Sequence, residues 1–227
     1  MVKHAGISPK KFASLMKSID GAGAPEPSED TSGDPIGTLV FSFLLWESTT
    51  DKAMAAREKI LQNVVDFNDL RVCMPEEIVS WIGARYPLAM ERCQRLRTVL
   101  RAIFAREHAM TLESVSKGGK REAKKYIESI DGMVPYVAAR VLLLAFDTHA
   151  VPADEQLRQK LRKAAVCDDT VTVEDLANWL THHIKAGKGV AAHHALQAWV
   201  EERGAKSASP RKVSRNGSSK PGKKARA

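Results

Sequence analysis

Apolar residues recur along this chain at intervals of three and four, which is the spacing of helices with one buried face. Pro, Ser, Thr or Asp stands where several of these runs begin, as is typical of helix starts. The pattern predicts helices over 8–19, 36–46, 51–65, 75–82, 87–106, 120–130, 135–146, 154–165, 173–184 and 190–203. Strand-like alternation is confined to 170–173, so the sequence predicts an all-α fold.

The helix predicted over 87–106 separates apolar residues from arginines. The side expected to face the core carries Ala89, Cys93, Leu96, Leu100 and Ile103. The outer side of the helix and its flanks are predicted to carry the arginines Arg92, Arg95, Arg97 and Arg101.

The stretch 120–165 is the one around which the rest of the chain is organised. Its first helix has an apolar stripe and a basic side, the latter with Lys120, Arg121, Lys124 and Lys125. Asp131-Gly132 then predicts a turn, because Gly adopts positive φ at no steric cost. Pro135 suits the first position of the next helix, which is apolar almost all round and therefore buried. Asp154 is placed to cap a third helix.

A glycine turn between two helices exposes the N–H groups that begin the second helix, and these form a ready site for a phosphate. Lys120, Lys124 and Lys125 lie beside this turn and strengthen its positive field. Asp154 would then lie near bound DNA. The composition around Asp154 also allows a plain structural interpretation, in which it does nothing but cap its helix.

These residues resemble the helix-hairpin-helix DNA glycosylases of the endonuclease III type. That family carries Leu-Pro-Gly-Val-Gly-x-Lys-Thr-Ala, an apolar helix ending in Ala-Phe, and then Val-Asp-Thr-His. This chain has Ile-Asp-Gly-Met-Val-Pro-Tyr-Val-Ala over 130–138, Ala-Phe at 145–146 and Ala-Asp-Glu-Gln over 153–156, with no gap in the register. Weaker similarities are Leu-Leu-Trp-Glu-Ser-Thr-Thr-Asp over 44–51 and the pair His193-His194, so the resemblance covers roughly 36–203.

The resemblance implies a two-domain helical glycosylase fold. A six-helix barrel would span 36–148, with the helix-hairpin-helix at about 120–146, and a second domain would combine 8–35 with 149–204. The resemblance places Asp154 and Tyr136 in the cleft between the domains as active-site residues. It implies DNA contacts at Gly132, Met133, Val134, Pro135, Lys120, Lys124, Lys125 and Ser48.

Four departures from the family pattern are visible. The second glycine of the hairpin is Val134, the lysine that attacks the sugar in bifunctional members is Tyr136, and the glutamine that wedges into DNA is Ser48. The loop of four cysteines that binds an iron–sulfur cluster in many members is missing. The three cysteines, Cys73, Cys93 and Cys167, are isolated, so we expect no cofactor, no disulfide framework and a reducing interior.

Two functions from different classes follow. The first is a monofunctional DNA glycosylase of base excision repair, which cleaves the N-glycosidic bond of a damaged or mismatched base. The second is a non-catalytic DNA-binding module that keeps the glycosylase fold. Asp154 favours the first, whereas Val134 favours the second because a β-branched residue is poorly suited to positive φ. Tyr136 makes no Schiff base, and it is alternatively a core aromatic residue.

The net charge of +8 lies in the tail, because the basic and acidic residues of 1–203 balance and no acid follows Glu202. The tail over 205–227 is predicted to be disordered and to grip a polyanion, unless it is merely a solubilising end. We expect a monomer that binds double-stranded DNA inside the cell, in the cytoplasm, nucleoid or nucleus. The longest apolar run, 36–46, is too short to cross a bilayer, and the histidine pairs have no metal-ligand spacing.

Overall fold

The computed structural model describes residues 6–20 and 34–205. These residues form helices and no strand, apart from an isolated bridge between Ile7 and Cys167, so the all-α prediction is confirmed. The helices are α1 (Pro9–Asp20), α2 (Pro35–Leu45), α3 (Thr50–Leu61), α4 (Phe67–Val72), α5 (Pro75–Ile82), α6 (Ala89–Glu107), α7 (Glu113–Lys117), α8 (Lys120–Glu128), α9 (Pro135–Ala145), α10 (Glu155–Lys163), α11 (Val173–His183) and α12 (Gly189–Ala205), with a 3-10 turn η1 (Ala186–Lys188). The predicted tail lies outside the described residues, except that Ala205 ends α12.

Local capping chemistry fixes where most of these helices begin. Proline opens α2, α5 and α9, and the side chains of Asp34, Asp66, Asp154 and Thr172 accept N–H groups at the starts of α2, α4, α10 and α11. The helix predicted over 51–65 ends earlier, at Leu61, because Asp66 starts the separate helix α4. Both α4 and α7 are short helices that the periodicity did not predict.

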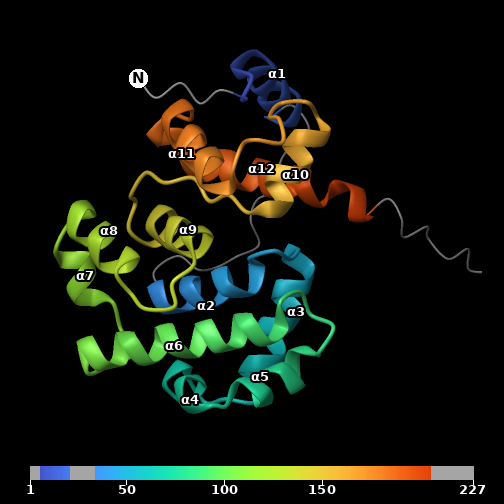
Figure 1. The fold of residues 1–227 in the computed structure, drawn as a ribbon. Coiled ribbons are helices and arrows are strands. Elements are labelled where there is room, and N and C mark those ends of the chain that lie inside the picture. The colour runs from blue at the N-terminus through green and yellow to red at the C-terminus, as the bar shows by residue number, and fades with distance from the viewer. Residues whose placement is uncertain (1–5, 21–33, 206–227) are drawn as a thin grey trace, which may run out of the picture.

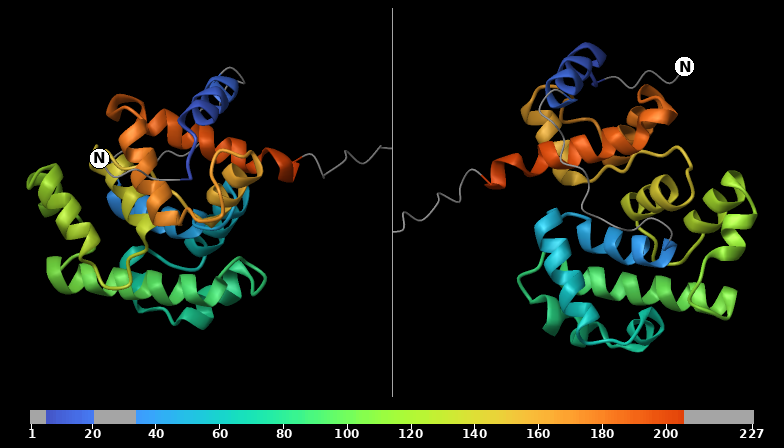
Figure 2. Two further views of the ribbon diagram at one scale, coloured as in Figure 1. Left: turned by 45° about the horizontal axis from the view of Figure 1, so that its top comes forward. Right: turned by 180° about the vertical axis from the view of Figure 1, so that it is seen from behind.

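The buried apolar side chains form two clusters. One is drawn from 36–146, and the other combines α1 with residues of 151–196. In Figure 1 the helices α2 to α6 fill the lower half of the molecule, while α1, α10, α11 and α12 fill the upper half. The rear view in Figure 2 shows the same division. The domain boundaries expected from the sequence remain a proposal that these clusters support, and residues 21–33 of the second domain lie outside the described part.

Helix α9 belongs to the first cluster, and a buried arginine on it also reaches the second. The Arg140 guanidinium donates to Ser42 Oγ on α2 (3.0 Å) and to His193 Nε2 on α12 (3.2 Å). His193 therefore accepts a hydrogen bond through a neutral ring. Burial and the adjacent guanidinium hold the pKa of His193 well below its usual range. His193 thus serves packing between the clusters.

A second buried arginine, Arg92, corrects the sequence prediction for α6. Its side chain is fully buried, not on the outside of the helix. The guanidinium donates to the carbonyl oxygens of Phe43, Trp46 and Pro87, and it lies over the rings of Trp46 and Tyr86. Ten of the eleven residues of α2 are buried, so the carbonyls at its end have no access to bulk water. Arg92 supplies the donors that they require.

We predict that Arg92→Met lowers the free energy of unfolding by about 2–4 kcal/mol, because it leaves several buried carbonyls without a donor. The matched control is Arg95→Met on the same helix, since Arg95 is half exposed and forms a surface ion pair with Glu91 (2.9 Å). That control should change stability by less than about 0.5 kcal/mol. Urea denaturation measures both variants, and equal effects would contradict the role given to Arg92.

Candidate active site

The hairpin between α8 and α9 has the geometry that the sequence predicts. Gly132 has a φ of +81°, and the Met133 N–H donates to the Ile130 carbonyl across the turn (3.2 Å). The turn packs closely on α6, because a Cβ atom at Gly132 would lie 3.1 Å from Thr98 side-chain atoms. Both the positive φ and the close approach therefore require glycine at this position.

Val134 does not carry the strain that its sequence position suggested. Its φ is −100° and its ψ is 136°, which is extended backbone that suits a β-branched residue. It is the N-cap of α9, and its side chain is buried. The expectation that Val134 would be forced toward positive φ is wrong. Val134 is therefore no evidence of a damaged hairpin.

The lysines beside the hairpin are exposed and partly engaged with acids. Lys120 Nζ lies 2.5 Å from Asp147 Oδ2, and Lys124 Nζ lies 3.9 Å from Glu128 Oε1. Lys125 is exposed on the same helix. Such exposed pairs are weak and exchange readily for another anion. The predicted contacts of these lysines, Met133 and Pro135 with DNA stay predictions.

Asp154 is the N-cap of α10, as predicted, and it is almost completely buried. Its carboxylate accepts the Leu157 N–H (2.9 Å) within α10 and the Glu47 N–H (3.2 Å) from the loop after α2. Burial raises the pKa of Asp154 above its ordinary value, against the effect of the two N–H groups. A carboxylate that merely caps a helix has no need of the second, distant donor.

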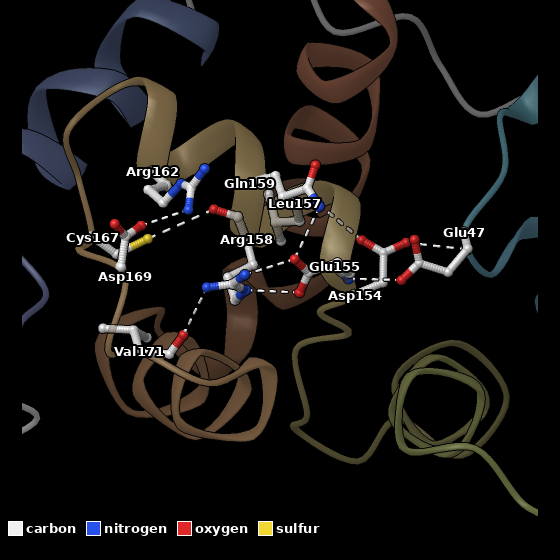
Figure 3. Close-up of polar contacts among 10 residues, drawn as sticks. All are labelled: Glu47, Asp154, Glu155, Leu157, Arg158, Gln159, Arg162, Cys167, Asp169 and Val171. Carbon is white, nitrogen blue, oxygen red and sulfur yellow. Dashed lines mark hydrogen bonds and ion pairs between the residues drawn. The ribbon is translucent and has the colours of Figure 1, made fainter.

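The distant donor belongs to a residue that the sequence analysis did not single out. Glu47 has a φ of +53°, which is unusual for a residue with a side chain. Glu47 Oε1 accepts the Glu155 N–H (2.7 Å), so the loop and α10 hold each other by two reciprocal hydrogen bonds, as Figure 3 shows. Burial first, and the neighbouring Asp154 second, raise the pKa of Glu47 to about 7. No sequence pattern links Glu47 to Asp154, because they are 107 positions apart.

Tyr136 and Asp154 line one small cavity, together with Pro152, Leu157, His193, Leu196, Gln197 and Val200. The Tyr136 hydroxyl lies 3.5 Å from Gln197 Oε1, and its ring is buried edge-on to His193. The cavity holds about 10 Å³, which is room for about one water molecule. The structure therefore brings these two site residues together around a space that is closed to a nucleobase.

A larger cavity of about 550 Å³ lies on the other face of the hairpin, between α9 and α11. Met133, Pro135, Ala138 and Thr181 are among its lining residues. Neither Tyr136 nor Asp154 lines it, so its size is not evidence of a base pocket.

Ser48 is buried, with its hydroxyl donating to the Tyr86 hydroxyl (3.2 Å). Tyr86 in turn donates to the Leu44 carbonyl (2.7 Å) at the end of α2. In this arrangement Ser48 has no exposed surface with which to wedge into DNA. Its contact with DNA stays a prediction that would need movement of the loop.

No protein-family model and no curated protein sequence matches this chain. Solved structures do match its fold. A trapped covalent intermediate of endonuclease III with DNA has a TM-score of 0.66 and 13% identity, over 85% of this chain and 86% of that one. A thermostable thymine-DNA glycosylase has a TM-score of 0.60 and 18% identity, over 89% and 90%. The H. pylori 3-methyladenine DNA glycosylase bound to 1,N6-ethenoadenine has a TM-score of 0.59 and 11% identity, over 86% and 98%.

The chain has the fold of the helix-hairpin-helix DNA glycosylases. The similarity covers most of the chain and most of each neighbour, so it concerns the whole two-cluster architecture and not the hairpin alone. The fold expected from the short motifs at 130–138 and 153–156 is thereby confirmed. At these levels of identity the glycosylase fold says nothing by itself about the base on which any one chain acts.

We predict that Gly132→Ala lowers the free energy of unfolding by about 1–2 kcal/mol, because alanine is strained at this φ and its Cβ meets Thr98. Gly187→Ala is the matched control, since Gly187 is not at positive φ and a Cβ there meets nothing within 4 Å. Urea denaturation of both variants tests this. A loss at Gly187 as large as at Gly132 would count against the strained turn.

Proposed function

We propose that this protein is a monofunctional DNA glycosylase, which removes a damaged or mismatched base from double-stranded DNA. The observation that carries the proposal is the place of Asp154. A nearly buried carboxylate stands at the start of α10, shares a cavity with the first turn of α9, and is held by a donor from a separate loop. Neighbours with the same fold that are bound to DNA, an endonuclease III and an 8-oxoguanine glycosylase/lyase, support a DNA glycosylase, whereas the monofunctional part of the proposal rests on Tyr136.

The reaction that Asp154 can support is hydrolysis of the bond between base and sugar. As the C1′–N bond breaks, its electron pair leaves with the base, and the sugar gains oxocarbenium character. The Asp154 carboxylate stabilises that positive charge, and its low-dielectric surroundings strengthen the effect. A water molecule then adds to C1′ and its proton passes to the departed base, which left with the electron pair, so that the products are the free base and an abasic sugar.

A base reaches Asp154 only if the nucleotide leaves the helical stack and the site opens. The present cavity admits about one water molecule, so the side chains that line it, including those of α12, must move when DNA binds. The loop over 46–49 is not part of that lining. It is held to α10 by the two Glu47 hydrogen bonds, which can stay in place while the cavity opens.

The hairpin is proposed to hold the DNA backbone. Helix α9 begins at Pro135, and the N–H groups of its first turn lie at the positive end of the helix, where a phosphate oxygen can be bound. The exposed lysines of α8 add to that field. We propose that one copy of the chain binds the duplex inside the cell. None of the described helices is long and apolar enough to cross a membrane.

The second candidate is a DNA-binding module with the glycosylase fold and no activity. The closed cavity favours it, because a site without space for a base cannot act as it stands. The extended backbone at Val134 gives the binding module no support, because the strain expected there is absent. Release of a base from any lesion-bearing duplex excludes the module, and binding without release from every lesion supports it.

We predict that Asp154→Asn slows base release under single-turnover conditions by about 100-fold or more, because it removes the negative charge beside the developing cation. Asparagine can still cap α10 through its amide oxygen, but its NH2 group then faces the Glu47 N–H, so stability should fall by about 1–2 kcal/mol, whereas affinity for DNA should be equal or higher. The matched control is Asp66→Asn, which alters another N-cap, at α4, far along the chain. Rapid base release by Asp154→Asn would refute the role of this residue.

We predict that borohydride traps no covalent complex between the protein and a substrate duplex. The position of the attacking lysine is Tyr136, whose phenol makes no imine. No lysine is among the described residues that line the cavity with Asp154. Denaturing electrophoresis of the borohydride reaction shows the outcome, and a trapped band would mean that a lysine from elsewhere enters the site.

A further inference from the structure

The Glu47 loop and the start of α10 are joined by a pair of carboxyl groups. The Glu47 N–H donates to Asp154 Oδ2 (3.2 Å), and Glu47 Oε1 accepts the N–H of Glu155 (2.7 Å), the residue that follows Asp154. Figure 3 shows the two carboxyl groups side by side at the N-terminal end of α10. Each side chain thus accepts a backbone N–H from the other segment, and both hydrogen bonds break if the loop moves away from α10.

The charges around this pair do not balance if both groups are ionised. Glu155 is neutralised by Arg158, whose guanidinium binds both of its carboxylate oxygens (2.6 and 2.7 Å), and the pKa of Glu155 is lowered to about 2. The other positive charge that acts on the pair, among the described residues, is Arg92 on α6, which donates to three neutral carbonyls and so keeps its charge. If Glu47 and Asp154 were both ionised, their two negative charges would therefore face one positive charge.

We propose that Glu47 is a positioning residue for Asp154, and that the working arrangement of the pair holds one proton, on Glu47. The inference rests on the proposed function. Burial opposes ionisation of both groups, but Asp154 accepts two N–H groups and Glu47 accepts one, and this difference favours the negative charge on Asp154. A proton on Glu47 removes the repulsion between the two carboxyl groups and leaves Asp154 as the anion that catalysis needs.

The backbone conformation at Glu47 also supports its role in positioning Asp154. A positive φ at a residue other than glycine costs on the order of 1 kcal/mol, and such residues persist only where surrounding contacts hold them. Here the strained φ directs the Glu47 N–H at Asp154 while the side chain reaches the Glu155 N–H. An ordinary helical or extended residue would not present both groups to α10.

The pair makes stability and excision depend on pH in a definite direction. The pKa of Glu47 is raised from 4.5 to about 7, so the folded protein holds a proton that the unfolded chain has already released. Its contribution to stability is fully present below about pH 4.5 and is lost as the pH rises through about 7. Above that value both groups are charged, repulsion loosens the loop from α10, and Asp154 is no longer held in place.

The test compares Glu47→Gln with the wild type across about pH 5 to about pH 8.5. The glutamine side chain is neutral at every pH, and its amide oxygen can still accept the Glu155 N–H. We expect the wild-type Tm to fall relative to that of Glu47→Gln as the pH rises. We expect the wild-type single-turnover excision rate to fall above about pH 7 toward a limit of about 10-fold per pH unit, the slope for the loss of one proton, and Glu47→Gln to lose this fall.

Glu77→Gln is the matched control. The carboxylate of Glu77 also accepts a backbone N–H, that of Met74 at the start of α5 (2.7 Å), and α5 carries none of the residues that line the cavity with Asp154. Its variant should keep the wild-type dependence of Tm and rate on pH. Glu47→Ala, which cannot hold the Glu155 N–H, should excise more slowly than Glu47→Gln at every pH with little change in DNA affinity.

Identical pH profiles for the wild type and Glu47→Gln, in both Tm and rate, would overturn the proposal. Complete loss of excision in a folded Glu47→Gln would overturn it too, because the proton of Glu47 would then be used in the chemistry itself. If no lesion is excised by the wild type, the proposed function fails. The Tm comparison then still decides whether Glu47 and Asp154 share a proton.

Discussion

The arrangement of the site depends on the buried guanidinium of Arg92. Helix α2 runs through the interior, so its last carbonyls must find donors inside the protein. Arg92 provides them from α6, and it also binds Pro87 at the start of that helix. The chain is thereby held where it leaves α2, and the next residue is Glu47. The position of Glu47, and through it the contact with Asp154, follows from how one arginine satisfies the end of one helix.

Two helix starts then meet at the same place from different parts of the chain. The first turn of α9 carries Tyr136, and the N-cap of α10 is Asp154. Arg140 fixes α9 against α2 and α12, so the hairpin cannot turn independently of the cavity. A helix N-terminus stabilises negative charge, whether on a phosphate or on a carboxylate. The fold therefore places the first turn of α9, which we propose as the phosphate site, next to the carboxylate of Asp154.

Local chemistry made much of this visible in the sequence. Pro135 at the start of α9, the Asp131-Gly132 turn and the cap at Asp154 depend on near neighbours in the chain, and the structure has them as predicted. The burial of Arg92 was missed because its acceptors lie 46 and 49 positions away. The strain expected at Val134 was wrong because a family glycine does not prove a positive φ in this chain. Glu47 was missed because its partner is supplied by tertiary structure alone.

The closed cavity gives the two candidate functions different expectations. A glycosylase must open it to admit a base, whereas a binding module can leave it closed. The most direct measurement is incubation of the wild-type protein with duplexes that each carry one damaged or mismatched base, followed by hot alkali to reveal abasic sites. The account predicts alkali-dependent strand breaks at one class of lesion and none on undamaged duplex. Duplexes that are bound tightly but remain intact after alkali, for every lesion, would contradict it.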